Sequence, residues 1–418
     1  MSGIYRLHNP VKTYAWGSET AIPELIGIPA VSGRPVAEWW IGAHPLGPSE
    51  VEGDGVRIPL DRWIAENPEE RLGHRVNTRF AGRFPFLLKV LAAAHPLSIQ
   101  VHPDREEAAA GFLLENEAGI PLDDPRRTFK DPNPKPECVC ALTPFWVMCG
   151  FQPIEAIRSH FEPFAAFLGD DGQPLHREDP HLHLRDFLKT LLEMDPHRKN
   201  RLLQAVREWL EHHPAPDVVT EWVPKLMRAY PEDIGSLAPF FMNVRCLQPG
   251  EALYLPPKTL HAYLEGMAIE IMVNSDNVVR GGLTPKHIDI PTLLGIVRFS
   301  SQSFEVLHPT PHGTCEQVYE IPEEAFGLSR IELSGGAFAE IPSTEGIEIF
   351  LCTEGKVEVS EWKTMADATK VQRGEAFLIP GNHPGIRMKG FGTVFRAFVP
   401  CERPVRSAIV HYFSKSSG

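Results

Sequence analysis

The stretch PLSIQVHPD, Pro96–Asp104, guides the interpretation of the whole chain. Read as a β-strand, it alternates an apolar and a polar face, because successive side chains point to opposite sides. The apolar face carries Leu97, Ile99 and Val101, and the polar face carries Ser98, Gln100 and His102. Each buried polar group without a partner costs roughly 1–3 kcal/mol. Gln100 and His102 therefore face either a wet cleft or a shared metal ion, which an amide oxygen and an imidazole nitrogen can ligate.

The composition is that of a globular chain with an excess of acidic residues. Its 418 residues predict two or three domains of about 100–200 residues each. The formal net charge of -13 argues against nucleic acid or an anionic membrane as a partner, because both attract basic surfaces. A small anionic substrate needs only a few cations in its site and is compatible with this charge.

The cysteines and the terminal sequence indicate a compartment. The seven cysteines form no Cys-x-x-Cys pair, which argues against a disulfide framework and a thiolate zinc site. The first residues, MSGIYRLHNPVKTYAWGS, lack the apolar core of a signal peptide. The sequence contains no run of about 18 apolar residues, so it predicts no membrane span. We therefore expect a cytoplasmic protein.

Strand patterns predict a mainly β protein. Short apolar segments broken by Pro and Gly are typical of antiparallel sandwiches and barrels. Such strands are expected in Glu38–Ala43, Phe84–Ala93 and Glu137–Phe151. We assign 1–152 and 240–300 to the two parts of one β domain, and 301–418 to a second, C-terminal β domain.

Residues 153–239 predict a helical insertion into the first domain. Apolar residues recur there at helical spacing in Leu184–Leu192, Leu202–Leu210 and Asp217–Tyr230. The histidines of this segment fall in loops and on polar helix faces, so we expect them at the solvated surface. They are His160, His176, His181, His183, His197, His212 and His213.

Two segments of the β regions echo each other, GEALYLPP at Gly250–Pro257 and GEAFLIPG at Gly374–Gly381. Each is followed by a histidine, His261 and His383 respectively. This pattern resembles the second motif of the cupin jelly roll, although so short an echo can also arise by chance. We infer a jelly-roll domain that carries the site and a second jelly-roll-like unit. The second lacks an equivalent of PLSIQVH, so we expect it to bind no metal.

Two further segments supply candidate ligands. In NPKPE, Asn133–Glu137, the prolines hold the backbone extended and project Lys135 and Glu137 to the same side. His261 follows a double-proline turn at a strand end, from which it can point inward; the alternative is a hydrogen-bonded core histidine.

Gln100, His102, Glu137 and His261 together offer two oxygens and two imidazole nitrogens. Zn²⁺ accepts such ligands, and the weak amide leaves room for water or substrate, as in catalytic sites. Because no thiolate takes part, the preference for Zn²⁺ over Co²⁺, Mn²⁺ or Fe²⁺ is modest.

The segment NSDNVVRGGLTPKH, Asn274–His287, supplies a candidate anion-binding group. Arg280 precedes Gly281-Gly282, which let a ligand approach the backbone closely. An arginine beside a metal cleft suits a phosphate or a developing enediolate, whereas the alternative is a structural arginine that caps carbonyls. Asp276 and Lys286 are weaker candidates in the same stretch.

Six segments, in order along nearly the whole chain, are similar to those of the type I phosphomannose isomerases. They are TYAWGS (Thr13–Ser18), AEWWIGAHPLGPS (Ala37–Ser49), PLSIQVHPD, PKPE (Pro134–Glu137), YLPPKTLHAYLEG (Tyr254–Gly266) and SDNVVRGGLTPKH (Ser275–His287). The pair Trp39-Trp40 and the region 123–130 depart from the family's pattern.

This resemblance implies a cupin fold with a helical insertion and a second β domain. It implies one zinc ion per subunit at Gln100, His102, Glu137 and His261, with Arg280 as the catalytic arginine. The implied substrate is a small sugar phosphate, and we expect a monomer that binds neither nucleic acid nor membrane.

The implied reaction interconverts mannose 6-phosphate and fructose 6-phosphate through an enediolate. We expect Arg280 to stabilise the enediolate and Lys135 to bind phosphate or transfer a proton. We expect Ser98 and Asp276 to contact the substrate. The base is open between Lys135, Asp276 and a water on the metal.

Two other functions use the same residues. His102, His261 and Glu137 form a two-His, one-carboxylate set that suits Fe²⁺ in a cupin oxygenase. Gln100 and the adjacent Lys135 and Arg280 favour a sugar phosphate instead. A non-catalytic sugar-binding regulator is the third hypothesis, and the complete set of candidate ligands argues against it.

Overall fold

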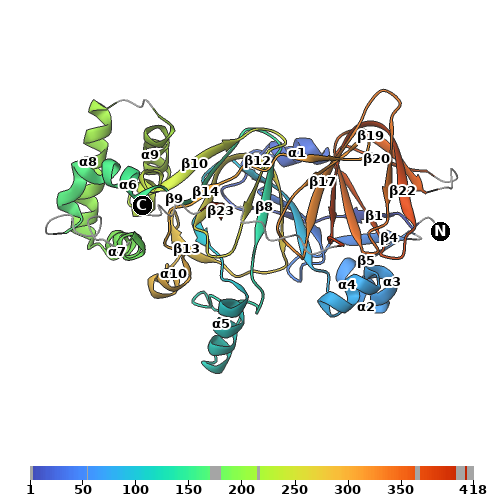
Figure 1. Cartoon of the computed structure of the whole chain (residues 1–418), viewed down its shortest axis with the longest axis horizontal. Coiled ribbons are helices and arrows are strands. Elements are labelled where there is room, and N and C mark those ends of the chain that lie inside the picture. Colours follow the sequence, from blue (N-terminus) through green and yellow to red (C-terminus); the bar gives the residue numbers. More distant parts are fainter. Residues whose placement is uncertain are drawn as a thin grey trace, which may run out of the picture.

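The structure is a computed structural model that describes residues 3–53, 55–169, 180–213, 217–362, 368–401 and 410–411. Figure 1 shows two β-sheets side by side along the long axis, with a group of helices beyond the first sheet. The expectation of a mainly β protein with a helical insertion is confirmed.

The first sheet contains ten strands of the described chain, with β12 at its centre. β12 pairs with β6, β7, β8 and β9, all antiparallel. The strands are β2 (Val11–Lys12), β3 (Glu38–Gly42), β6 (Phe86–Ala93), β7 (Ile99–Val101), β8 (Glu137–Ala141), β9 (Phe145–Phe151), β10 (Met242–Leu247), β11 (Ala252–Leu255), β12 (His261–Val273) and β13 (Val279–Gly282). β3, β6, β8 and β9 confirm the strands expected in the first 152 residues.

The second sheet contains eleven strands of the described chain and draws on both ends of the sequence. β1 pairs with β21 on one side and with β4 on the other, so residues near the N-terminus extend a sheet built mainly after residue 310. The strands are β1 (Tyr5–His8), β4 (Glu50–Gly53), β5 (Val56–Pro59), β15 (Thr310–His312), β16 (Glu316–Tyr319), β17 (Gly327–Leu333), β18 (Phe338–Pro342), β19 (Glu348–Glu361), β20 (Thr369–Gln372), β21 (Glu375–Ile379) and β22 (Gly385–Phe398). A separate short pair joins β14 (Ser303–Phe304) to β23 (Val410–His411).

One hydrophobic core joins the two sheets. Leu88 of β6 and Leu351 of β19 are both fully buried and belong to the same cluster of packed side chains. Tyr319 of β16 adds a polar link, because its hydroxyl donates to the carbonyl of Gly250 at 2.8 Å. The second sheet therefore packs against the first through a shared apolar core and this hydrogen bond.

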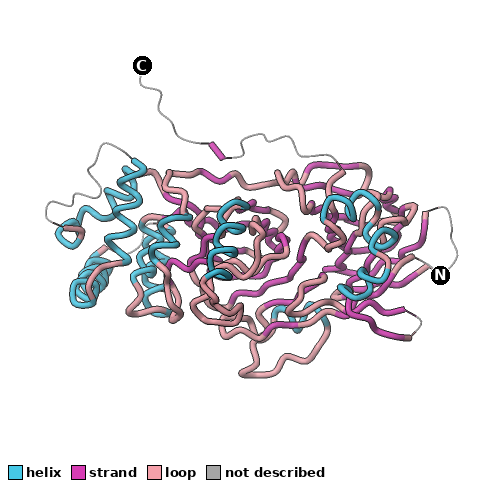
Figure 2. The backbone as a smooth tube through the Cα atoms, turned by 90° about the horizontal axis from the view of Figure 1, so that it is seen from below, coloured by secondary structure: helices cyan, strands magenta, loops and turns pink. Residues whose placement is uncertain are grey.

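The helical insertion lies at one end of the molecule in both views (Figures 1 and 2). It contains α6 (Ile154–Phe161), η1 (Glu162–Phe167), α7 (Pro180–Leu192), α8 (Pro196–His212), α9 (Val218–Ala229) and η3 (Ile234–Phe240). The apolar faces of α7, α8 and α9 pack into one cluster with Ile99 and Val101 of β7, which confirms the helical periodicity. Asp195 and Asp217 cap α8 and α9 by accepting hydrogen bonds from backbone N–H groups.

Shorter helices interrupt the strands and were not expected from the sequence. They are α1 (Ala21–Ile26), α2 (Leu60–Glu66), α3 (Pro68–Leu72), α4 (His74–Phe80), α5 (Arg105–Glu117) and α10 (Ile290–Ile296). All but α5 have seven residues or fewer, too few turns for a clear period in the sequence. Within the described ranges, no helix combines the length and apolar character that a membrane crossing requires.

The expectation that the histidines of the helical insertion lie at the solvated surface is only partly correct. His197, His212 and His213 are exposed as expected, but His183 is buried, with 2% of its surface exposed. Its helix packs His183 inward beside Arg158, whose Nη2 lies 3.4 Å from the ring Nδ1. His160 is half-buried and donates to the carbonyl of Phe240 at 2.9 Å. His176 and the side chain of His181 lie outside the described residues.

The echoed segments adopt the same local structure. Gly250 and Gly374 both have positive φ, 88° and 80°, which favours glycine at the turns before β11 and β21. His261 and His383 follow these strands and are both buried, but their rings are protonated differently. The Nδ1 of His261 donates to the carbonyl of Thr259, whereas the Nδ1 of His383 accepts from the N–H of Gly385. His383 therefore carries a proton, not a lone pair, on Nε2.

Candidate active site

Strand register places three predicted site residues on one face of the first sheet. β7 lies between β12 and β13, and Gln100 is directly opposite His261 on one side and Arg280 on the other. Side chains of directly opposed residues project from the same face of a sheet. Gln100, His261 and Arg280 therefore point toward a common volume.

The alternation predicted from Pro96 to Asp104 holds only in part. β7 begins at Ile99, and Ile99 and Val101 pack toward the helical insertion as expected. Leu97 instead packs in a different cluster with Tyr263, because the chain is not yet in the strand there. Ser98 is half-buried and directly precedes β7.

His102 is held between two anchored segments. Two residues later, Asp104 caps α5 by accepting from the N–H of Glu107 at 2.9 Å. The carbonyl of His102 accepts from the N–H of Lys258, which follows the double-proline turn before His261, at 2.8 Å. The two histidine segments are therefore tied together by a backbone hydrogen bond.

His102, Glu137 and His261 converge in the interior. One ligand atom from each lies within 4.8 Å of the others, and all three residues are buried. The Nε2 of His102 lies 3.4 Å from Oε1 of Glu137, and the Nε2 of His261 lies 3.3 Å from Oε2. The structure brings together these three predicted ligands, which could hold a metal ion.

Backbone carbonyls orient both imidazole rings. The Nδ1 of His102 donates to the carbonyl of Asn277 at 2.7 Å, and that of His261 to the carbonyl of Thr259 at 2.9 Å. Each Nε2 therefore presents a lone pair toward Glu137, and that of His102 has no hydrogen-bond partner among the described residues. A backbone carbonyl behind the ring is a common arrangement for metal-binding histidines.

The protonation states also fit a divalent metal. Burial, reinforced by the ammonium of Lys135, lowers the pKa of His102 to about 4, so its ring is neutral near pH 7. Burial opposes ionisation of Glu137, but the ammonium of Lys135 is the largest of the causes that outweigh it and hold its pKa well below the usual range. Two imidazole nitrogens and one carboxylate are a donor set that Zn²⁺ accepts.

Asn277 is a site residue that the sequence analysis missed. It is buried, and its side chain accepts from the N–H of Lys130 at 2.7 Å and donates to the carbonyls of Asp131 and Asn133. The loop before Glu137 is thereby fastened to the backbone that orients His102. The segment containing Asn277 was identified, but the sequence does not show which carbonyl meets the histidine.

A second buried group of charges adjoins the ligands. The Nζ of Lys89 lies 2.8 Å from Glu270 and 3.9 Å from Glu38, and Tyr263 donates to Glu270 at 2.9 Å. The hydroxyl of Tyr263 also lies 3.4 Å from Glu137, which connects the two groups. The sequence analysis missed this group, although a lone lysine in the otherwise apolar β6 was a signal for it.

The charges around the ligands favour a cation. Lys135 lies 2.8 Å from Glu137, as the proline-stiffened segment predicted for this pair. Together with Lys89, it faces the carboxylates of Glu38, Glu137 and Glu270. Three carboxylates face only two ammonium groups in this buried volume, and burial, reinforced by the negative charge of Glu137, raises the pKa of Glu270. A divalent cation at the histidines would offset that charge.

Asp276 lies at the edge of this site. Its Oδ1 lies 3.4 Å from Nε2 of the buried His44, and its N–H donates to Asp131 at 2.8 Å. Partial burial opposes its ionisation, but the hydrogen bond from His44 lowers its pKa below the usual range. Asp276 is therefore an ionised carboxylate held in place from two sides.

Arg280 and Lys286 form a cationic pair. Arg280 is half-buried, and among the described residues no hydrogen bond or ion pair occupies its guanidinium, which argues against a structural capping role. Burial lowers the pKa of Arg280, and repulsion from Arg280 lowers that of Lys286. Two neighbouring cations that have no carboxylate partner in the described part of the chain are suited to an anion.

Fold and site define a class, that of a mainly β protein whose sheet gathers two histidines and a carboxylate beside an arginine that no described residue pairs with. The chain belongs to the type I phosphomannose isomerase family. Residues 4–154 match the family model described as "Phosphomannose isomerase type I, catalytic domain".

Relatives match over nearly the whole chain. A mannose-6-phosphate isomerase of Escherichia coli (strain K12) is 39% identical over 398 residues, which cover 94% of this chain and 99% of the relative. A mannose-6-phosphate isomerase of Homo sapiens is 32% identical and covers 91% of this chain and 94% of the relative.

Solved structures share the fold. A variant of phosphomannose isomerase from Salmonella typhimurium aligns with a TM-score of 0.89 at 36% identity, over 95% of this chain and all of that chain. A zinc-bound mannose 6-phosphate isomerase aligns with a TM-score of 0.88 at 36% identity and the same coverage of this chain.

Proposed function

We propose that this protein is a zinc-dependent isomerase that interconverts mannose 6-phosphate and fructose 6-phosphate. The observation that carries the proposal is the register of β12, β7 and β13, which sets His261, Gln100 and the free Arg280 side by side. Membership of the type I phosphomannose isomerase family and the names of the relatives support the choice of substrate.

We assign the metal to His102, Glu137 and His261, with the amide oxygen of Gln100 as a fourth, weaker ligand. The unpartnered Nε2 of His102 and the larger number of carboxylates than ammonium groups around the ligands support this assignment. Bound zinc supplies Lewis-acid polarisation of the sugar oxygens.

The residues of the chain would then bind, orient and exchange protons. Arg280 is placed to stabilise the negative charge of an enediolate, a contact that strengthens as that charge develops. Lys286 and Ser98 would bind the phosphate group. Lys135, buried against Glu137, and Asp276, held by His44, are the two protein groups that could carry a proton between C1 and C2.

The oxygenase alternative would use the same three ligands with Fe²⁺. The relatives reported above are isomerases, and a cationic pair beside the ligands suits a phosphorylated sugar. These observations favour the isomerase. We further propose a cytoplasmic location, which the seven unpaired cysteines support because thiols persist in reducing compartments, and a monomeric state.

A coupled assay with metal analysis tests the proposal. Purified protein is expected to contain about one zinc per chain and to form fructose 6-phosphate from mannose 6-phosphate, with activity lost on chelation and restored by Zn²⁺. Zinc-loaded protein that is inert toward mannose 6-phosphate would contradict the isomerase. Oxygen uptake with Fe²⁺ would favour the oxygenase. Sedimentation velocity checks the monomeric state.

A further inference from the structure

The turn between α9 and η3 connects the helical insertion to both strands that flank the candidate site. At one end of the turn, the hydroxyl of Tyr230 donates to the carbonyl of Pro96 at 2.8 Å, three residues before β7. At the other end, Asp233 accepts from the N–H of Thr284 at 3.0 Å, two residues after β13. One turn of the insertion therefore binds the segment that leads into β7, which carries Gln100, and the segment that follows β13, which carries Arg280.

The carboxylate of Asp233 accepts from two backbone donors. Its Oδ1 accepts from the N–H of Gly235 at 2.7 Å and caps η3, while its Oδ2 accepts from Thr284. A carboxylate can accept both hydrogen bonds, whereas an amide would turn a donor toward one of the two N–H groups. The position is therefore matched to Asp rather than to Asn.

Backbone contact reinforces this link. A Cβ added at Gly282 would lie 3.0 Å from Cα of Gly235, and one added at Gly235 would lie 2.9 Å from N of Leu283. Gly282 has φ 142° and the buried Leu283 has φ 53°, so the chain turns sharply just after Arg280. Asp233 lies at the point where this strained turn meets the insertion.

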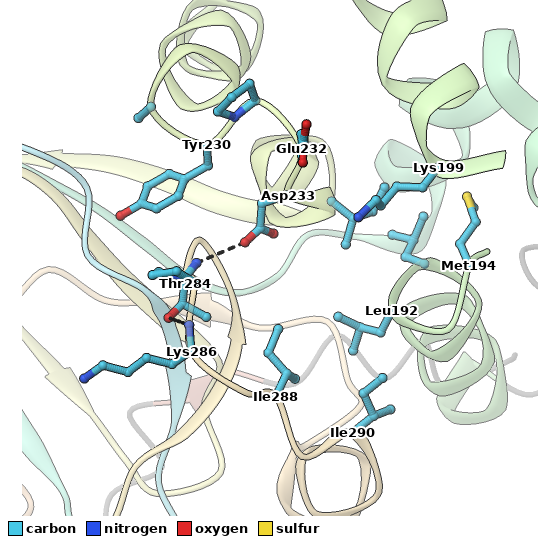
Figure 3. Close-up of a pocket in the computed structure, with 15 residues that line it drawn as sticks. Leu192, Met194, Lys199, Tyr230, Glu232, Asp233, Thr284, Lys286, Ile288 and Ile290 are labelled. Carbon is cyan, nitrogen blue, oxygen red and sulfur yellow. Dashed lines mark hydrogen bonds between the residues drawn. The ribbon is translucent and has the colours of Figure 1, made fainter. Parts of the chain in front are cut away.

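The loop beyond the turn has little packing of its own. Figure 3 shows Asp233 and Thr284 facing each other at a pocket of about 760 Å³, with Lys286 extending away from them. Pro285, Lys286 and His287 are exposed, and the hydroxyl of Thr284 accepts from the N–H of Lys286 at 3.1 Å. The hydrogen bond to Asp233 is therefore a polar contact that links the backbone of Lys286 to the insertion through Thr284, between the apolar contacts of Leu283 and Ile288.

We infer that Asp233 is a positioning residue: its carboxylate fixes the Thr284–Lys286 segment and so sets where the cations of Arg280 and Lys286 stand relative to Gln100. The inference rests on the proposed function for its effect on turnover, but its effect on anion binding does not. The helical insertion then contributes to the anion site without touching the substrate.

The test compares two capping aspartates of the insertion. Asp217 caps α9 through the N–H and hydroxyl of Thr220, so Asp217→Ala also removes two accepted hydrogen bonds but leaves Thr284 alone. In Asp233→Ala, we expect kcat/KM for mannose 6-phosphate to fall at least about tenfold and the Kd for inorganic phosphate to rise by a similar factor. The zinc content of Asp233→Ala should stay at the wild-type level. Asp217→Ala should be less stable than wild type but keep its kcat/KM and its Kd for phosphate.

Two further measurements separate positioning from stability. Asp233→Asn keeps the volume and one acceptor, so it is expected to fold and to show an intermediate loss of phosphate binding. In a Lys286→Ala background, Asp233→Ala should weaken phosphate binding by a smaller factor than in the wild-type background, because the side chain that Asp233 positions is missing.

Each result decides the inference. If both Asp233 variants change phosphate binding and KM no more than Asp217→Ala does, or if the Lys286→Ala background leaves the effect fully additive, Asp233 has only a structural role. If the wild-type protein does not isomerise mannose 6-phosphate, the proposed function fails, and calorimetry with inorganic phosphate still decides the role of Asp233.

Discussion

The Nζ of Lys135 lies 2.8 Å from Oε1 of Glu137, the same oxygen that lies 3.4 Å from Nε2 of His102. One carboxylate thus serves a candidate metal ligand set and a buried ammonium group at once. A proton on Lys135 and a cation at the histidines are then coupled through Glu137, because both stabilise its negative charge.

Removing the Lys135 ammonium group should lower turnover without removing the metal. We expect Lys135→Met to lose about 10²–10⁴ in kcat, the range for a proton-transferring group, at unchanged zinc content. Lys135→Arg keeps the charge beside Glu137 and serves as the matched control. Steady-state kinetics with metal analysis measures both. Activity within about threefold of wild type in Lys135→Met would assign proton transfer to another group, with Asp276 next to be tested.

Arg280→Ala should remove stabilisation of the enediolate. We expect kcat to fall by about 10²–10³, as for loss of a single donor to a developing oxyanion, while zinc content holds. Arg245→Ala, on the exposed face of β10, is the matched control and should retain wild-type kinetics. A change of less than about threefold at Arg280 would mean that its role is structural.

The two echoed histidines should differ in metal binding. His261→Ala removes a ring whose lone pair faces Glu137, so we expect loss of zinc and of activity together. His383→Gln alters the corresponding ring of the second unit, whose Nε2 carries a proton, and should leave zinc content unchanged. Metal analysis after dialysis of both variants measures this difference. Equal zinc loss in the two variants would contradict the assignment.

The stability of the C-terminal unit should fall in mild acid through His383. Burial lowers the pKa of His383, although Glu361 and Glu348 oppose this. The unfolded ring, with a pKa of about 6.5, then binds a proton that the folded ring resists, so stability decreases as pH falls below that value. Urea unfolding at pH 7 and pH 5.5 should show a smaller decrease for His383→Gln than for wild type. The same decrease in both proteins would rule out this group as the cause.

Lys89→Met should destabilise the protein by leaving Glu270 as an unpaired buried charge. The expected loss is about 3–5 kcal/mol in the free energy of unfolding, typical of breaking a buried pair from one side. Lys89→Met combined with Glu270→Gln should recover part of it, since only Glu38, which accepts a hydrogen bond from Trp40, then lacks its ammonium partner. Denaturant unfolding of the zinc-loaded variants measures both. A double variant as unstable as the single one would point to packing rather than charge.

The sequence predicted the candidate site better than its surroundings. His102, Glu137 and His261 were found because each lies in a local pattern: an alternating strand, a proline-stiffened segment and a double-proline turn. The helices of the insertion were found because their apolar periodicity is also local. The links from Lys89 to Glu270 and from Asp233 to Thr284 join positions far apart in sequence, so no window of residues shows them. The placement of β1 beside β21 has the same cause.

That placement has a consequence for synthesis of the chain. Tyr5 of β1 is opposite Leu378 of β21, so β1 is synthesised long before the strand with which it pairs, which lies about 370 residues further along the chain. Until then its edge is open, and contacts with chaperones or with other nascent chains compete for it. We therefore expect that neither fragment of a chain divided near residue 300 folds stably on its own.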